Sequence, residues 1–170
     1  MRKWLLIFLS ASLLFARTQI WIELDSNVEF DLSLVLYPPL IYPTYYFPTL
    51  ASPLNPQGIR LRLGYRRRPP GGHTVSTLYL ATRGSGNFSS SIDLDQLFFA
   101  PDGEPLPPPG VDPPGGNWRS YSITYQQIEQ FPVVGIAQIF IRPQDFIFQT
   151  EPDDEPGNFT ITIYYRLYGL

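Results

Sequence analysis

The chain has 170 residues, of which 44% are hydrophobic and 15% aromatic, and its formal net charge is −3. This composition allows one domain with a substantial core and argues against disorder. The 19 prolines and 13 glycines argue against a helical protein, because both residues interrupt helices. Cysteine is absent, which excludes a disulfide framework, a thiolate metal site and a cysteine nucleophile.

The N-terminal segment 1–16 has the pattern of a secretory signal peptide. Arg2 and Lys3 form its positive region, residues 4–15 its apolar region, and Ala16 is a small residue at the expected cleavage point. The apolar run is shorter than the roughly 20 residues of a membrane-spanning helix, so an uncleaved anchor is the less favoured alternative. Cleavage lowers the 12 basic residues to 10 against 15 acidic ones, a formal charge of −5. We therefore expect export, no membrane span after cleavage, and no binding of nucleic acid.

The remaining residues, 17–170, are expected to fold as a single β-domain. The pattern is clearest in 159–168, where an apolar set of alternate residues faces a set rich in threonine and tyrosine. Almost every residue there is β-branched or aromatic, the types that suit a packed sheet. Comparable alternation predicts strands at 18–24, 28–36, 59–65, 74–82, 88–94, 118–126, 133–141 and 145–150.

Turns and short elements complete the expected order. Glycines predict a turn at 84–87, and Arg142-Pro-Gln predicts a break between the last two internal strands. Residues 95–100 are expected to form a short strand or a helical turn, and 127–131 one helical turn. About eight to ten short strands without a convincing helix predict an all-β fold, an antiparallel β-sandwich.

Two proline-rich stretches, 37–56 and 101–116, are expected to be long loops of this sandwich, because so much proline is incompatible with a central strand. The first carries five aromatic residues of special interest. They are Tyr37, Tyr42, Tyr45, Tyr46 and Phe47. Long loops in compact domains are often functional, so these rings form a candidate binding surface. The alternative is that they pack on one end of the sandwich.

No motif in the chain predicts catalysis or a cofactor. The only histidine, His73, stands in a glycine-rich turn, whereas metal sites and catalytic triads need several partners. The acidic run 153–155 offers hard oxygens for calcium, but its spacing matches no known calcium-binding loop. The arginines at 66–68 predict either a solvated hairpin tip or a contact with an acidic neighbour or polysaccharide. We therefore expect no enzyme, no cofactor and no metal.

The segment 118–170 ends in Pro-Gly-Asn-Phe-Thr-Ile-Thr-Ile-Tyr-Tyr-Arg-Leu, and an alternating strand follows the signal segment directly. In these features the chain resembles exported bacterial β-sandwich proteins of the spore coat U and fimbrial pilin type. The resemblance implies an immunoglobulin-like, pilin-like subunit whose sheet is completed by a strand from a neighbouring copy. The donor would be 17–24, with Ile20, Ile22 and Leu24 as the inserted residues. The alternative is that this segment pairs within its own chain.

Two functions follow from these expectations. The first is a structural or assembly protein of the periplasm, cell surface or extracellular space, a pilin-like subunit that pairs by β-strand addition. Its partners would be other copies of itself or another surface protein. The alternative is a monomeric secreted binding module that takes a glycan or a protein partner through its aromatic and proline-rich loops.

Overall fold

The computed structural model describes residues 18–31, 41–68, 73–87, 93–154 and 160–170. Within these ranges the chain forms strands β1 to β9 and one short 3-10 helix, Leu94–Gln96, which confirms the expected all-β class. The strands make two antiparallel sheets. The expected signal peptide, 1–16, and the candidate residue Tyr37 lie outside the described residues.

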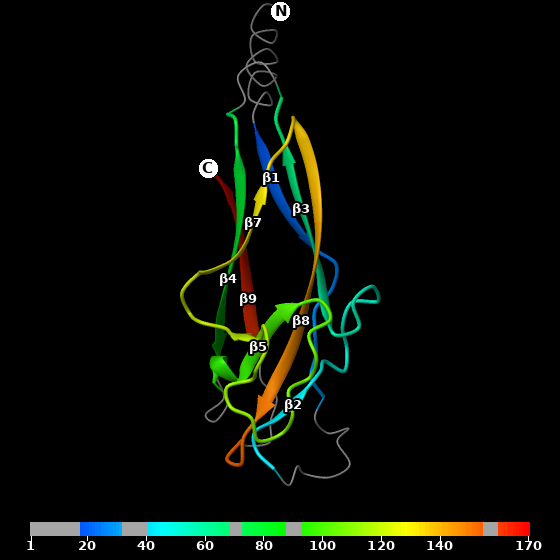
Figure 1. The fold of residues 1–170 in the computed structure, drawn as a ribbon, viewed down its shortest axis with the longest axis vertical. Coiled ribbons are helices and arrows are strands. Elements are labelled where there is room, and N and C mark those ends of the chain that lie inside the picture. The colour runs from blue at the N-terminus through cyan, green and yellow to red at the C-terminus, as the bar shows by residue number, and fades with distance from the viewer. Residues whose placement is uncertain (1–17, 32–40, 69–72, 88–92, 155–159) are drawn as a thin grey trace, which may run out of the picture.

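The larger sheet has six strands in the order β1-β3-β8-β5-β6, and β2 also pairs with β8. These strands are β1 (Gln19–Leu24), β2 (Thr44–Tyr46), β3 (Gly58–Arg66), β5 (Leu97–Pro101), β6 (Arg119–Ser120) and β8 (Ala137–Thr150). The long strand β8 extends through both halves of the molecule (Figure 1). It pairs with β3 in the upper half of the figure and with β5 and β2 in the lower half.

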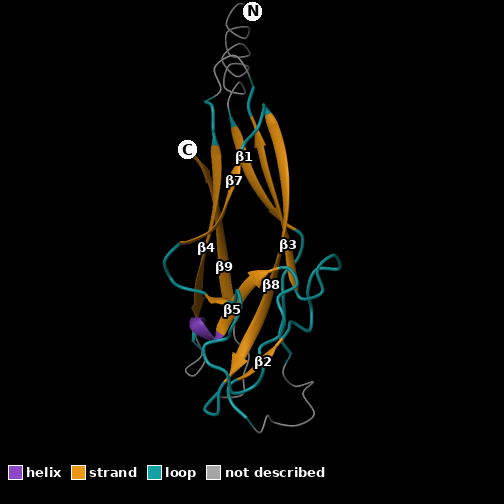
Figure 2. Ribbon diagram, in the orientation of Figure 1, coloured by secondary structure: helices purple, strands orange, loops and turns teal. Residues whose placement is uncertain are grey.

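The smaller sheet has three strands in the order β7-β4-β9. They are β4 (Thr77–Asn87), β7 (Gln126–Pro132) and β9 (Thr160–Gly169). The two sheets face one another in Figure 2, and apolar side chains from both fill the space between them. The deeply buried members of this core are Leu61, Leu63, Tyr65, Leu78, Leu80, Phe99, Phe131 and Phe146.

A second apolar cluster lies on the other face of the larger sheet, in its lower half. Phe98 and Ile147 belong to it, whereas their sequence neighbours Phe99 and Phe146 belong to the main core. Successive residues of a strand point to opposite faces, so both faces of β5 and β8 are buried here. Tyr45, from the first proline-rich stretch, and Trp118, which follows the second, cover this second face.

Strict alternation in the sequence predicted the best-defined strands correctly. The expected strand 18–24 is β1, 59–65 is β3, and the C-terminal strand is β9. In β3 the apolar residues Ile59, Leu61 and Leu63 are buried, while the two arginines between them, Arg60 and Arg62, point outward. The segment 101–116 is a loop after its first residue, as predicted.

The expected turn at 84–87 is wrong, because β4 continues to Asn87 and pairs with β9 along this stretch. Gly84 lies on the inward side of the strand, and the side chain of Leu94 packs where its Cβ would be. A Cβ built on Gly84 would lie 2.3 Å from Cδ1 of Leu94. The glycine therefore allows a close approach within a strand, and does not form a turn.

The expected break at Arg142-Pro-Gln is also wrong, since β8 is continuous. Pro143 stands opposite Arg60 in the pairing of β3 with β8. The backbone N–H of Arg60 donates to Oδ1 of Asp25 at 2.8 Å, on the side away from β8. The pair Arg60–Pro143 is thus one in which neither residue donates to the other strand, so proline removes no hydrogen bond between β3 and β8.

Three further expectations about secondary structure differ from the structure. The predicted helical turn at 127–131 is strand β7, where a bulge opposite Leu80 and Ala81 lets both Ile128 and Phe131 pack on the core despite their helix-like spacing. The predicted strand 118–126 is a strand only at Arg119–Ser120 and at its last residue, Gln126, where β7 begins. Over the described part of 28–36, the chain makes only an isolated bridge between Glu29 and Leu50.

Candidate functional site

The predicted strand-exchange residues lie on β1, the outermost strand at one edge of the larger sheet. Within the described residues β1 pairs only with β3, in a register that places Ile20 opposite Tyr65 and Ile22 opposite Leu63. Both isoleucines are half-buried against the main core. Leu24, at the end of the strand, is 50% exposed. The structure therefore brings Ile20 and Ile22 together on the core but leaves Leu24 at its margin.

Polar contacts at the end of β1 hold it against its neighbours. The carboxylate of Asp25 accepts the Arg60 N–H through Oδ1, and it accepts the hydroxyl of Ser52 through Oδ2 at 2.6 Å. On the outer surface Nη1 of Arg62 lies 2.8 Å from Oε2 of Glu23, with both side chains about half exposed. Such an exposed ion pair contributes little stability, so β1 is held chiefly by backbone pairing and the two isoleucines.

A groove of about 660 Å³, lined by both polar and apolar residues, opens between the sheets beyond the end of β1. One wall is β9, an edge strand that pairs only with β4 within the described residues, so one row of its backbone groups has no strand partner there. Phe30 packs over Phe148, with ring centroids 5.8 Å apart. The apolar residues that line the groove are Leu24, Val28, Phe30, Ile59, Leu97, Phe146, Phe148, Ile161 and Ile163. The sequence pattern did not predict this groove.

The aromatic residues of the first proline-rich stretch do not form one exposed platform. Tyr45 is only 2% exposed, and its hydroxyl donates to the carbonyl oxygen of Val111 at 2.6 Å. Burial raises the pKa of Tyr45 to about 12. The ring of Phe47 lies against Trp118, with centroids 6.5 Å apart. The rings of Tyr45 and Phe47 thus pack the loops onto the sheet. Tyr42 and Tyr46 are half-buried.

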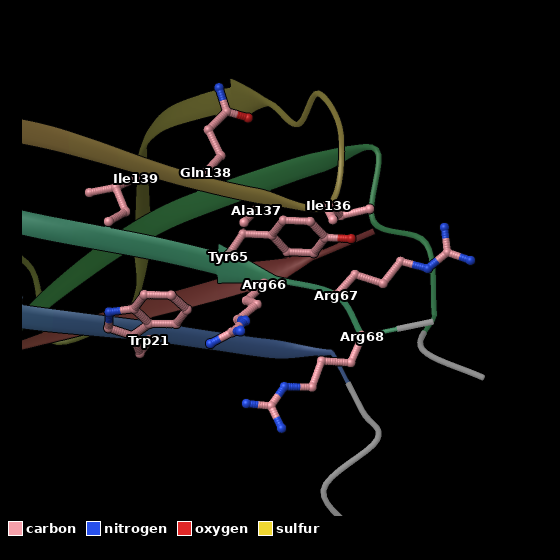
Figure 3. Close-up of a pocket in the computed structure, with 9 residues that line it drawn as sticks. All are labelled: Trp21, Tyr65, Arg66, Arg67, Arg68, Ile136, Ala137, Gln138 and Ile139. Atoms are coloured by element: carbon pink, nitrogen blue, oxygen red, sulfur yellow. The ribbon is translucent and has the colours of Figure 1, made fainter. Parts of the chain in front are cut away.

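A second cleft of about 660 Å³ lies at the upper end of the larger sheet, beside Trp21 (Figure 3). Trp21 stands opposite Gly64, and a Cβ on that glycine would come within 2.0 Å of the indole ring. The arginines at 66–68 lie along the cleft, and the backbone of Arg67 donates to Ile136 at 2.7 Å. The predicted basic tip is therefore next to an aromatic ring and an aliphatic strand end.

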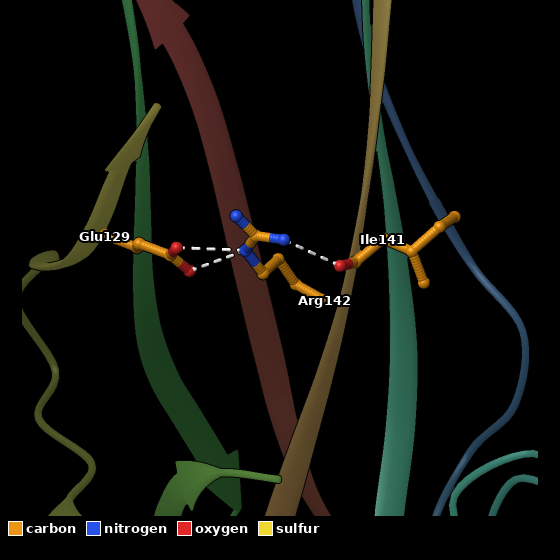
Figure 4. A network of polar contacts seen from close by, with 3 residues as sticks. All are labelled: Glu129, Ile141 and Arg142. Carbon is orange, nitrogen blue, oxygen red and sulfur yellow. Dashed lines mark hydrogen bonds and ion pairs between the residues drawn. The ribbon is translucent and has the colours of Figure 1, made fainter. Parts of the chain in front are cut away.

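An ion pair between β7 and β8 joins the two sheets (Figure 4). Arg142 on β8 donates through Nε to both carboxylate oxygens of Glu129 on β7, at 2.9 and 3.1 Å. The Arg142 guanidinium also lies 4.7 Å from the ring centre of Phe131. The pair stands at a smaller cleft of about 370 Å³ between the sheets, which both residues line. Each partner neutralises the other, so this cleft has no unbalanced charge from the pair.

A buried polar network crosses the core beneath these clefts. The hydroxyl of Tyr165 hydrogen-bonds to Oε1 of Gln144, and it lies 3.3 Å from the hydroxyl of Tyr121. Burial raises the pKa of both tyrosines, and for Tyr121 the neighbouring Tyr165 raises it further. Both therefore stay protonated at neutral pH and act as hydrogen-bonding groups of the core.

Asp145 is fully buried on β8, and its Oδ2 accepts the backbone N–H of Gly103 at 2.8 Å. Burial raises the pKa of Asp145 above its ordinary value of 3.8, although its hydrogen bonds act in the other direction. The contact fixes the start of the second proline-rich loop on the sheet. The partner of this carboxylate is thus a backbone N–H and not a cation, which indicates that Asp145 has a structural role.

The acidic turn considered for calcium makes structural hydrogen bonds. Asp154 accepts from Nε2 of Gln96 at 2.9 Å and from the backbone N–H of Glu151 at 2.7 Å. Within the described ranges, no three His, Cys, Asp or Glu residues are grouped so that they could hold a metal ion. His73 is exposed and its carbonyl oxygen accepts the hydroxyl of Thr18. No helix in the described part of the chain is long and apolar enough to cross a bilayer.

No protein-family model matches the chain, and neither curated proteins nor solved structures provide a significant match.

Proposed function

We propose that the protein is an exported structural or assembly subunit whose copies associate by exchange of strand β1. In the exchanged form, β1 of one copy pairs with β3 of the next, and Ile20 and Ile22 enter the neighbour's core. Its place of action is the periplasm, the cell surface or the extracellular space. The finer fold that accompanies this proposal is an immunoglobulin-like, pilin-like β-sandwich.

The observation that carries this proposal is the peripheral position of β1. It lies at a sheet edge, all of its strand pairing within the described residues is with β3, and it comes first among the described strands. An edge strand that pairs with a single neighbour can leave its own sheet and pair identically with a second copy, because the contacts are the same in both arrangements. The edge of β9, which has no second strand partner among the described residues, and the groove beside it offer a second place where a strand can add.

The experiment that tests the proposal compares the chain starting at Arg17 with a chain starting at Ser26, by measuring solution mass over a range of concentrations. We expect a ladder of oligomers for the longer chain and loss of that ladder for the shorter one. A synthetic peptide of residues 17–24, added to the shorter chain, should bind it and restore its stability. A stable monomer of the longer chain at all concentrations contradicts the proposal.

The second candidate function, a binding module for a glycan, is supported by a surface other than the predicted loops. Tyr45 and Phe47 pack inward, so the loop that contains them offers fewer exposed rings than expected. Partly exposed tyrosines and arginines instead gather on the smaller sheet.

A further inference from the structure

The outer face of the smaller sheet carries tyrosines and arginines in direct cross-strand pairs. The register of β4 with β9 sets Tyr79 opposite Tyr168 and Arg83 opposite Tyr164. The two rings of the first pair stack with centroids 5.4 Å apart, and Cζ of Arg83 lies 4.5 Å from the ring centre of Tyr164. Alternate residues of β4, such as Leu78, are buried in the core, so these pairs point outward.

Tyr125, which precedes β7, joins the two arginines of this surface. Its ring centre lies 5.3 Å from Cζ of Arg83 and 5.7 Å from Cζ of Arg166. Arg166 also lies 5.7 Å from the ring centre of Tyr168, and it stands opposite Ala81, whose small side chain leaves room for it. We call the following six residues the tyrosine–arginine face: Tyr79, Arg83, Tyr125, Tyr164, Arg166 and Tyr168.

This face is locally cationic on a chain whose formal net charge is −3. Neither Arg83 nor Arg166 forms an ion pair with any described residue. The Nε of Arg83 is buried and has no hydrogen-bond partner among those residues. The neighbouring outward residues of β7, Gln127 and Gln130, are exposed and uncharged. The surface therefore has positive charge, aromatic rings and amides, with no described carboxylate to balance the arginines.

We propose that the tyrosine–arginine face binds an acidic polysaccharide, a glycan that carries uronate carboxylates. A guanidinium can donate two parallel hydrogen bonds to a carboxylate, and stacking on tyrosine rings already restricts its motion, which lowers the entropy lost on binding. The rings of Tyr125 and Tyr164, which are 43% and 40% exposed, can pack against the C–H faces of sugar rings. Charge complementarity thus selects an anion, and the exposed rings select a sugar. The proposal does not depend on the exchange of β1.

A binding titration of the purified full-length protein with polygalacturonate tests this inference, with dextran as the uncharged control. We expect binding of polygalacturonate that weakens as salt is raised, and no measurable binding of dextran. Arg166→Gln should weaken binding about tenfold, the loss expected for one charge-assisted contact. Arg60→Gln is the matched control, because Arg60 lies outward on β3 of the other sheet, and binding should stay within about twofold.

Tyr125→Ala provides a second variant, since Tyr125 is exposed and lies outside the strands, so its replacement should leave them unchanged. It should weaken binding several-fold without lowering the unfolding temperature. The proposal is overturned if polygalacturonate does not bind, if dextran binds equally well, or if Arg60→Gln and Arg166→Gln cause equal losses. Tighter binding of single-stranded DNA than of polygalacturonate would also overturn it, because the face would then select a different class of polyanion.

Discussion

The guanidinium of Arg142 on β8 meets the carboxylate of Glu129 on β7, with Nε 2.9 Å from Oε1, and the pair joins the two sheets on one side of the molecule. The same guanidinium lies over the rings of Phe131 and Phe140, at 4.7 and 5.9 Å from their centres. Arg142 therefore contributes charge, ring contacts and an aliphatic stem to the closure of this side.

Replacing Arg142 with alanine should lower the free energy of unfolding by about 2 kcal/mol, because the contacts of the stem and rings are lost together with the ion pair. The matched control is Arg62→Ala, which breaks the exposed pair with Glu23 and should cost about 0.5 kcal/mol. Urea unfolding of the two variants measures the difference. Equal losses would show that Arg142 acts only as a surface charge.

Gly64 is expected to be irreplaceable beneath Trp21. A Cβ at this position would lie 2.0 Å from Cε2 of the indole, so Gly64→Ala must displace the ring or the strand. We expect a loss of about 1–3 kcal/mol in the free energy of unfolding, the usual cost of overpacking. Gly115→Ala is the control, because nothing lies within 4 Å of its added Cβ. If the two substitutions have the same effect, the ring does not occupy this position in solution.

The buried carboxyl of Asp145 predicts a specific pH dependence. Burial raises its pKa in the folded protein above the ordinary value of 3.8. Between the ordinary pKa, which applies to the unfolded chain, and the raised pKa of the folded protein, the folded state holds more protons than the unfolded state. The contribution of Asp145 to stability therefore falls as pH rises through that window. Above the folded-state pKa the full cost of burying the charge is present.

Asp145→Asn keeps an oxygen that can accept the Gly103 N–H but removes the titration. The free energy of unfolding of the variant minus that of the wild type should therefore increase from acidic to neutral pH. Chemical unfolding at several pH values measures this difference, in which the acids common to both proteins largely cancel. A difference that stays constant, or decreases with pH, contradicts the proposed environment of Asp145.

Strands with strict alternation could be predicted from the sequence, because their two faces meet different environments. The expectations that failed concern residues whose role depends on a distant partner. Pro143 fits within β8 because its partner Arg60 directs its N–H away from β8, toward Asp25. Position 84 requires glycine because the side chain of Leu94 occupies the space that a Cβ would take. The bulge on β7 likewise produces a helix-like spacing in a strand. Local propensity contains none of this information.

The candidate sites also depend on partners that lie far apart in the sequence. The period of β1 predicted correctly that Ile20 and Ile22 share one face. The tyrosine–arginine face appeared in the sequence only as the polar side of the last strand, because its cross-strand partners on β4 come about 80 positions earlier. For Tyr45 the sequence leaves two alternatives, exposure on a binding loop or packing on the sandwich, because its burial depends on Phe98, which lies far along the chain, with ring centroids 6.1 Å apart.

The most direct test of strand exchange uses the absence of cysteine from the chain. Glu23 and Arg62 stand opposite each other on β1 and β3, so Glu23→Cys combined with Arg62→Cys places two thiols within reach of a disulfide. After oxidation, the account predicts a ladder of covalently linked chains on a non-reducing gel, which collapses to a monomer on reduction. A monomer with one internal disulfide at every protein concentration would show that β1 stays in its own sheet, and would contradict assembly by exchange of β1.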